Sequence, residues 1–144
     1  MIQTIPSYFN PFPVYYYNGG SPEPPQPTLT PLTFTSKGAI NGISLEKKGS
    51  PINVSLYYNK NDTEWVNYSL GTIIELASGD TIAFSGNNDH FSKDYNNYYK
   101  FAMTGSIEAS GDVQSLMNFS DSCTDYCYYN LFSGCTALVS ISQL

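Results

Sequence analysis

Apolar and polar residues alternate along most of the chain from Leu32 onward. The segments LTFTS (32–36), INVSLYY (52–58) and YYKFAMTG (98–105) place apolar side chains at roughly every second position. This is the period of a strand with one buried face. Turn residues separate such segments about every 8–12 residues, as in antiparallel sandwiches. Because no segment carries a long amphipathic helix pattern, we predict an all-β fold, an antiparallel β-sandwich or small barrel.

Two glycine turns are predicted to close β-hairpins. The segments TIIEL (72–76) and TIAFSG (81–86) flank a Gly-Asp turn, and YYKFAMTG meets SIEAS (106–110) at Gly105. Glycine suits such turns because it adopts positive φ without steric cost. We therefore expect each of these strand pairs to be neighbours in one sheet.

Two further positions carry structural expectations. The run NKND (59–62) predicts a turn, and Trp65 after it is expected to reach inward. Gly42 lies within an apolar strand segment and predicts a bend or a bulge there.

Residues 1–31, the N-terminal arm, differ in composition from the rest of the chain. Eight of the nine prolines lie at or before Pro31. Proline lacks a backbone donor and fixes φ, so neither a helix nor a central strand is expected. Residues 18–31 predict a turn followed by a polyproline II spacer. The aromatic residues of the arm precede this spacer: Tyr8, Phe9, Phe12, Tyr15, Tyr16 and Tyr17.

These aromatic residues predict a docking function for the arm. Disordered linkers are usually poor in aromatics, whereas each ring can bury about 150–250 Å² in a partner. We expect the arm to bury its rings in a larger assembly. The alternative is that the arm folds back onto its own domain as an edge strand.

The last segment, 123–144, follows a different period. Its apolar positions recur three or four residues apart: Leu131, Phe132, Cys135, Leu138, Ile141 and Leu144. This spacing fits one leucine-rich-repeat turn better than a plain strand. We therefore divide the chain into a docking arm with its spacer (1–31), an antiparallel β-domain (32–122) and a leucine-rich-repeat-like unit (123–144).

The charge pattern argues against some partners. The net charge is −6 and all six basic residues are lysines. Only Lys47 and Lys48 are adjacent, so the clustered cations that nucleic-acid binding needs are missing. Residues 1–10 show no signal-peptide pattern, and no run approaches the roughly 20 apolar residues that span a bilayer. We expect a protein made in a cytoplasm, without a visible export signal, without membrane insertion and without a nucleic-acid partner.

No motif predicts catalysis. His90 is the only histidine, and we expect a solvated loop residue because no further ligands stand at metal-binding spacing. Cys123, Cys127 and Cys135 lack a paired Cys-x-x-Cys motif and predict structural thiols. The segment NNDHFSKD (87–94) has oxygen ligands but lacks the glycine and closing glutamate of a Ca²⁺ loop. We predict no enzymatic activity, no metal site and no cofactor.

Tyrosine supplies the candidates for an exposed contact surface: Tyr95, Tyr98, Tyr99, Tyr128 and Tyr129. Tyrosine rings on a weakly charged β-surface can stack on sugars or pack between subunits. Neighbouring residues on a strand point to opposite faces, so each adjacent pair is expected to keep one ring outward. Contact with a host-surface glycan, contact within an oligomer and packing within the sheet all remain open.

The segment LFSGCTALVSISQL (131–144) resembles the repeat unit of BspA-like leucine-rich-repeat proteins. The matching positions are Phe132, Cys135, Leu138, Ile141 and Leu144. The stretch from Ile52 to Asn88 resembles a β-domain found ahead of such repeats in proteins of Bacteroidales and their crAss-like tailed phages. That likeness rests on a strand ending in tyrosine, an Asn/Asp turn, Trp65, a Gly-Asp turn and a Phe-x-Gly-Asn end. Together the resemblance covers about residues 32–144.

The resemblance implies a surface-displayed module with two possible homes. One is a structural virion protein, such as a head fibre, a capsid decoration protein or a tail appendage, anchored by its arm on the virion surface. The other is a leucine-rich-repeat adhesin on a bacterial cell surface. The arm and the missing export signal favour the virion. By analogy with phage fibres we expect a homo-oligomer, with a trimer favoured, and a natural chain that continues past Leu144, because a solenoid needs about three repeats.

Overall fold

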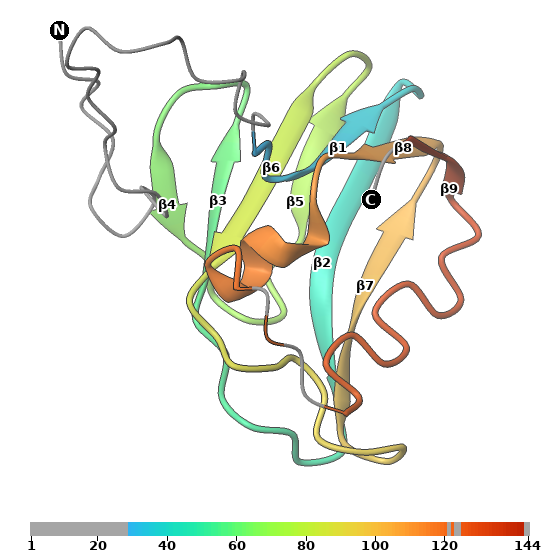
Figure 1. Cartoon of the computed structure of the whole chain (residues 1–144). Coiled ribbons are helices and arrows are strands. Elements are labelled where there is room, and N and C mark those ends of the chain that lie inside the picture. Colours follow the sequence, from blue (N-terminus) through green and yellow to red (C-terminus); the bar gives the residue numbers. More distant parts are fainter. Residues whose placement is uncertain (1–28, 121, 123–124, 143–144) are drawn as a thin grey trace, which may run out of the picture.

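The chain folds into two β-sheets that face each other. The computed structural model describes residues 29–120, 122 and 125–142. Six strands form one sheet in the order β4-β3-β6-β1-β8-β9, and three strands form the other in the order β5-β2-β7 (Figure 1). The strands are β1 (Leu32–Ser36), β2 (Ile40–Lys48), β3 (Leu56–Lys60), β4 (Trp65–Asn67), β5 (Ile74–Ala77), β6 (Thr81–Gly86), β7 (Tyr98–Thr104), β8 (Ile107–Ser110) and β9 (Leu138–Ser142).

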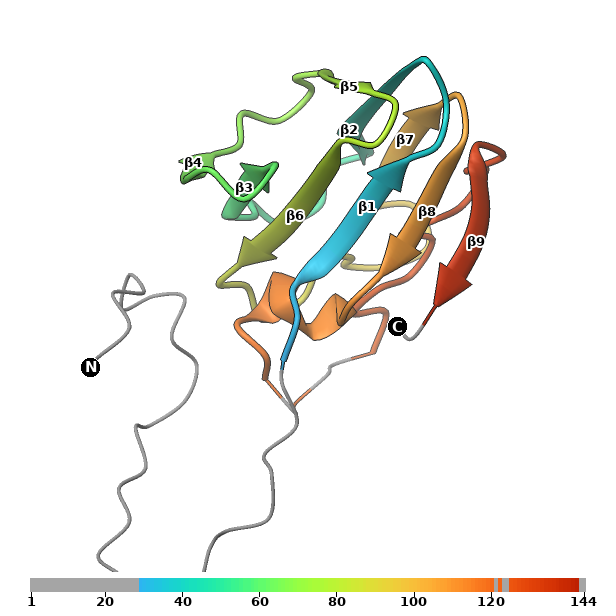
Figure 2. The same ribbon diagram turned by 90° about the horizontal axis from the view of Figure 1, so that it is seen from above.

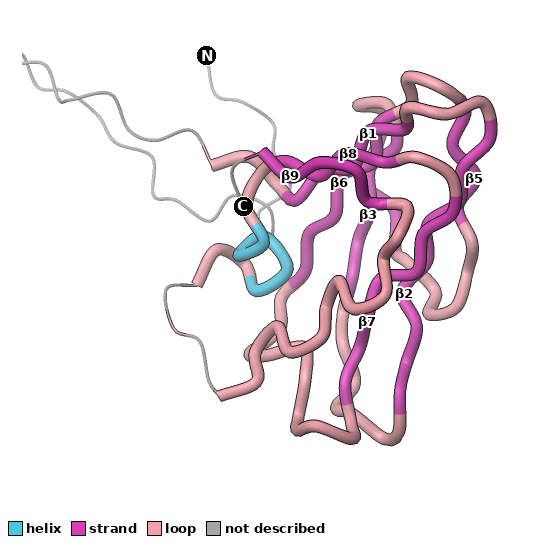
Figure 3. The backbone as a smooth tube through the Cα atoms, turned by 90° about the vertical axis from the view of Figure 1, so that its right-hand side faces the viewer, coloured by secondary structure: helices cyan, strands magenta, loops and turns pink. Residues whose placement is uncertain are grey.

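The all-β, sandwich-like prediction is confirmed. Besides strands, the described residues contain one short 3₁₀ helix, η2 (Val113–Met117). Within the same residues, no helix has the length and apolar character that crossing a bilayer requires. Figure 2 shows the six-stranded sheet as one layer over β2 and β7. In Figure 3, β8 and β9 run across the view whereas β2 and β7 run down it.

Alternation of side chains builds the inner face of the six-stranded sheet. Leu32 and Phe34 in β1 are buried and pair with Phe84 and Ile82 in β6, which are also buried. The two threonines of β1, Thr33 and Thr35, point to the opposite face because side chains alternate along a strand. The apolar positions recognised in the sequence are therefore those that form the core.

Aromatic rings join the two sheets. The ring centroids of Phe34 and Phe101 lie 5.1 Å apart, and those of Phe84 and Phe101 lie 5.2 Å apart. Phe101 belongs to β7 in the three-stranded sheet, and all three side chains are fully buried. Since each ring buries about 150–250 Å², this cluster contributes much of the apolar area that holds the sheets together.

The two predicted hairpins are wrong, because both connections cross from one sheet to the other. β5 and β7 lie in the three-stranded sheet, whereas β6 and β8, which follow them in sequence, lie in the six-stranded sheet. Gly79 and Gly105 do turn the chain, with φ angles of 87° and 85°. β2 also runs through Gly42 with continuous pairing to both neighbours, so there is no bulge there. Alternation has the same period in both sheets and cannot reveal which sheet a strand joins.

Asn41 links two connections that cross between the sheets. Its Nδ2 donates to Ser36 Oγ and to Ser106 O (3.2 Å), and its Oδ1 accepts from Ser106 N (3.0 Å). Asn41 is only 2% exposed. A Cβ atom at Gly105 would lie 1.3 Å from Asn41 Oδ1, so only glycine fits beside this amide. The side chain thereby ties the connection between β1 and β2 to the one between β7 and β8.

Residues 125–142 pack against the same core as the strands. The ring of Phe132 stacks on Phe101 with centroids 6.0 Å apart, and Leu131 is 2% exposed. Cys135 Sγ donates to Phe101 O (2.9 Å). After a series of turns, β9 pairs with β8 in parallel and forms the edge of the six-stranded sheet. The division of the chain at residue 122 and the repeat assignment of 123–144 stay predictions.

Candidate functional site

Four tyrosine rings meet on the surface and form what we call the tyrosine cluster: Tyr95, Tyr98, Tyr126 and Tyr129. Ring centroids are 4.8 Å apart for Tyr95–Tyr126, 5.4 Å for Tyr95–Tyr129, 5.6 Å for Tyr98–Tyr129 and 5.8 Å for Tyr126–Tyr129. The interplanar angles lie between 73° and 89°, so every pair is edge to face. Such pairs contribute about 0.5–1.5 kcal/mol beyond their buried area.

Two segments far apart in the sequence bring these rings together. The loop before β7 and the start of β7 supply two of them, and the turns at 125–137 supply the other two. Phe91 N donates to Cys127 O (2.9 Å), and Ser92 Oγ donates to Tyr129 O (2.8 Å). These hydrogen bonds fix the turns against the loop, and the ring contacts follow from that attachment.

Asp94 shapes the loop that carries Tyr95. Its Oδ1 accepts hydrogen bonds from Asn96 N (2.9 Å) and from Asn97 Nδ2 (2.8 Å). These bonds, first of all the one from the Asn96 backbone, favour the carboxylate and lower the pKa of Asp94. An aspartate that binds the backbone two residues ahead is a common way to fix a turn. The position of Tyr95 is therefore set by its own loop.

The cluster presents both ring faces and hydroxyl groups. Tyr95 is 62% exposed, and the other three rings are half-buried. A hydrogen bond with Tyr95, then desolvation and the negative charge of Asp125 and Asp94, raises the pKa of Tyr126. A neutral phenol both donates and accepts hydrogen bonds. The surface thus suits a ligand that has apolar patches and hydroxyl groups side by side.

The structure divides the tyrosines that the sequence singled out. Three of them lie in the tyrosine cluster: Tyr95, Tyr98 and Tyr129. Tyr99 is 2% exposed and donates its hydroxyl to Ile52 O (2.7 Å), so burial removes it from the predicted contact surface. Tyr128 is half-buried and packs against the core. Tyr126 was missed, because strand alternation carries no information about residues in turns; its spacing of three from Tyr129 was the available signal.

The arm residues predicted to dock, Tyr8, Phe9, Phe12, Tyr15, Tyr16 and Tyr17, lie outside the described residues. The described chain begins at Leu29 and enters β1 at Leu32. In Figure 1 this entry (blue) lies in the upper part of the view, whereas the loop before β7 (yellow to gold) hangs at the bottom. The tyrosine cluster is therefore remote from the point where the arm joins the domain.

Other residues that could bind a metal or react lie partly or fully within the packed domain. His90 lies in a loop as predicted but is only partly solvated, because it is half-buried and its Nδ1 is buried without a hydrogen-bond partner. Cys127 Sγ donates to Met117 Sδ (3.0 Å). Burial raises the pKa of Cys135, and Cys123 lies outside the described residues. The described ranges contain no group of three or more His, Cys, Asp or Glu side chains that could hold a metal ion.

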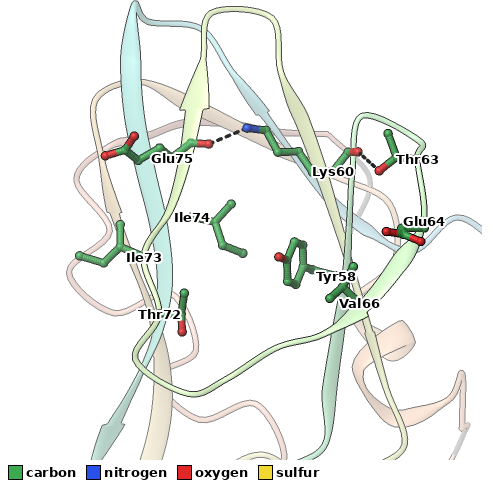
Figure 4. A pocket seen from close by; sticks show the side chains of 9 residues that line it. All are labelled: Tyr58, Lys60, Thr63, Glu64, Val66, Thr72, Ile73, Ile74 and Glu75. Atoms are coloured by element: carbon green, nitrogen blue, oxygen red, sulfur yellow. Dashed lines mark hydrogen bonds between the residues drawn. The ribbon is translucent and has the colours of Figure 1, made fainter.

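A groove of about 550 Å³ opens between β3, β4 and β5 (Figure 4). Tyr58 and Ile74 face one another across it, while Ile73 points away and is 68% exposed. Lys60 Nζ donates to Glu75 O (2.9 Å) and bridges the opening. Since β4 and β5 are edge strands of their sheets, the groove is the open side of the sandwich.

No family model, curated protein or solved structure matches the chain. A cluster of partly exposed rings on hydrogen-bonded turns is suited to binding a surface.

Proposed function

We propose that this chain is a non-enzymatic attachment and display module of a virion, as a head fibre, a capsid decoration protein or a tail appendage. Residues 1–31 hold it in the larger assembly, and the β-domain projects outward. The tyrosine cluster is the observation that supports this best, because it lies away from the arm junction, where a displayed contact surface belongs (Figure 1).

The way the arm joins the domain supports a tether. Thr33 Oγ1 donates to Pro31 O (2.7 Å), and Asp112 N donates to Thr30 O (2.8 Å). The arm then continues as β1, which is hydrogen-bonded to β6 on one side and β8 on the other. A pull on the arm is shared by the ladders on both sides of a central strand, an arrangement that resists detachment better than an edge strand.

The chemistry of the cluster supports attachment to a host-surface glycan. Sugars present apolar C–H faces next to hydroxyl groups, and tyrosine offers a ring face and a neutral hydroxyl. The chain carries only 12% charged residues, so few cations are available for an anionic ligand. Contact between copies of the chain in a homo-oligomer, of which a trimer is favoured, uses the same side-chain properties.

A leucine-rich-repeat adhesin on a bacterial surface is the second candidate function. The parallel pairing of β9 with β8 after a run of turns favours it, because repeat proteins add one parallel strand per unit. The neighbouring genes distinguish the two candidate functions. Capsid, portal and tail genes support the virion assignment, and surface-polysaccharide or secretion genes support the adhesin.

Two variants test the proposed function in assembled particles. A chain without residues 1–31 should fold but be missing from purified particles, because the anchor is lost. Tyr95→Ala with Tyr129→Ala should leave incorporation unchanged and reduce adsorption to host cells. Ile40→Ala is the matched control, since Ile40 is an apolar side chain that is 80% exposed at another part of the surface. Normal incorporation of the truncated chain would overturn the anchoring proposal.

A further inference from the structure

An aspartate directly precedes each ring of the closest pair in the tyrosine cluster. Asp94 precedes Tyr95 in the loop before β7, and Asp125 precedes Tyr126 in the turns at 125–137. The centroids of these two rings are 4.8 Å apart. Two carboxylates from distant parts of the chain are therefore carried by the segments that bring the two rings into contact.

Both carboxylates act on the cluster through their charge. After the hydrogen bond with Tyr95 and desolvation, the negative charges of Asp125 and Asp94 also raise the pKa of the Tyr126 hydroxyl. Asp125 is exposed, and Asp94 is half-buried. The hydrogen bonds within its own loop lower the pKa of Asp94 and so keep its carboxylate ionised. A ligand that lies on these rings therefore meets a negative potential.

The lysines of this region do not cancel that potential. Lys93 is next to Asp94 and offsets one of the two carboxylates in part. Lys48 and Lys100 lie on strands of the three-stranded sheet beside Glu46: Lys48 Nζ is 3.5 Å from Glu46 Oε2, and Lys100 is opposite Glu46 in the register. The end of the cluster that is formed by the loop and the turns stays negative.

The backbone at Tyr126 adopts a conformation that is uncommon for tyrosine. Its φ is 64°, in the left-handed region that favours glycine. Such a conformation costs free energy and persists where the surrounding structure enforces it, often at binding sites. Here the hydrogen bonds from Phe91 N to Cys127 O and from Ser92 Oγ to Tyr129 O hold the turn in place. The chain thus tolerates local strain at the residue that completes the cluster.

These features define the chemistry of a matching ligand. The face of a tyrosine ring attracts a cation, and a nearby carboxylate adds to that attraction. The same rings stack on the apolar C–H face of a sugar, and their hydroxyl groups donate and accept hydrogen bonds. An amino sugar, which is a hexose with a protonated amino group, combines both properties. A sugar that carries a carboxylate meets like charges instead.

We propose that the tyrosine cluster is a binding site for an amino sugar, whose ring stacks on the exposed Tyr95 and whose ammonium group lies beside Asp94 and Asp125. This inference rests on the proposed attachment function and deepens it by naming the charge of the ligand. Attachment itself needs only a glycan on the host surface, so the attachment function can hold where the amino-sugar inference fails.

Three glycosides with the same hexose ring and different charges test the proposal. The methyl glycosides of glucosamine, glucose and glucuronic acid are positive, neutral and negative. Each is titrated into the full-length chain by saturation-transfer NMR at mildly acidic pH, where the amino group is protonated and aspartate carboxylates are ionised. The glucosaminide should bind about five- to ten-fold more tightly than the glucoside, and the glucuronide should bind most weakly. Added salt should reduce the advantage of the glucosaminide.

Three variants link the selectivity to the cluster. Asp125→Asn should remove most of the advantage of the glucosaminide and leave the glucoside unaffected, because the amide has the same shape without the charge. Asp62→Asn is the matched control: it changes the net charge equally, but Asp62 lies in the turn between β3 and β4, in the upper part of the view, away from the cluster (Figure 1). Tyr95→Ala should weaken the binding of all three glycosides.

Several results would overturn the inference. Equal binding of the three glycosides, or tightest binding of the glucuronide, would show that positive charge does not select the ligand. Absence of binding by all three would remove the site. An equal effect of Asp125→Asn and Asp62→Asn would reduce the selectivity to net charge. Binding of N-acetyl-lysine methylamide as tight as that of the glucosaminide would assign the cluster to a basic protein partner.

The proposed function is tested separately in particles. If Tyr95→Ala with Tyr129→Ala abolishes adsorption while the three glycosides bind equally well, the attachment function is supported and only the amino-sugar inference is overturned. If these particles adsorb normally, the attachment role of the cluster is overturned, whatever the purified chain binds. Asp125→Asn should be incorporated into particles normally, because the charge of the cluster has no part in anchoring.

Discussion

Two buried asparagines should differ strongly in how much stability they lose on substitution by alanine. Asn41→Ala removes three hydrogen bonds and leaves Ser106 N without its partner, while Ser36 Oγ keeps only its bond to Gly38 O. At about 0.5–1.5 kcal/mol net for each hydrogen bond, the expected loss is about 2–4 kcal/mol. Asn59→Ala removes an acceptor that bonds to nothing. Its effect on the free energy of unfolding should lie within about 0.5 kcal/mol of zero, or be slightly stabilising.

Urea denaturation followed by far-ultraviolet circular dichroism measures both effects. Tryptophan emission is unsuitable because Asn59 pairs directly with Trp65. With a slope of about 1–3 kcal/mol per molar urea, the midpoint of Asn41→Ala should fall by on the order of 1–2 M, while that of Asn59→Ala should hardly move. An equal loss in both variants would refute the reasoning, because Asn59 would then stabilise the fold as Asn41 does.

Three further results are expected. Gly105→Ala should destabilise the chain, because Gly105 has a φ of 85° and an added Cβ would clash with Asn41. In a double-mutant cycle, the variant that also carries Asn41→Ala should lose less stability than the sum of the two single losses, because the clash is then removed. Burial raises the pKa of Tyr68 and Tyr99. Their stabilising contribution is therefore present below the unfolded pKa of about 10 and should be lost as the pH rises beyond it. Thermal melts between neutral and alkaline pH measure this loss. Hydrogen bonds from Asn61 and Ala77 lower the pKa of Asp80. Its contribution to stability is therefore present above about pH 3.9 and should disappear on further acidification. Thermal melts of Asp80→Asn should accordingly depend less on acid pH.

The sequence was sufficient for the fold class and insufficient for the division into sheets. Strict alternation, as in LTFTS and TIAFSG, identified strands whose buried residues now form the core. Both predicted hairpins failed, because a tight glycine turn permits two strands to pair but does not require it. Contacts such as the hydrogen bond between Asn41 and Ser106, which are 65 residues apart, form only in the folded chain and leave no local pattern in the sequence.

The candidate sites show the same limit at the level of single residues. Adjacent tyrosines on β7 were expected to point to opposite faces, and Tyr98 does face the cluster while Tyr99 faces the core. In EWVN, the neighbours Trp65 and Val66 are both apolar, so alternation does not decide which one points inward. The register Asn59↔Trp65 decides it, and this register follows from the turn before β4.

The construction of the tyrosine cluster bears on how attachment would work. Tyr98 begins β7, and hydrogen bonds hold the turns that carry Tyr126 and Tyr129 against the loop that carries Tyr95. A small group of rings binds a single sugar weakly, because one sugar ring buries little area. Linking several copies raises the overall affinity by about 10²–10⁴ without any new contact. If the chain acts through sugars, the expected homo-oligomer is therefore part of the binding mechanism, and a monomeric form should bind single glycosides normally while losing adhesion to a glycan-coated surface.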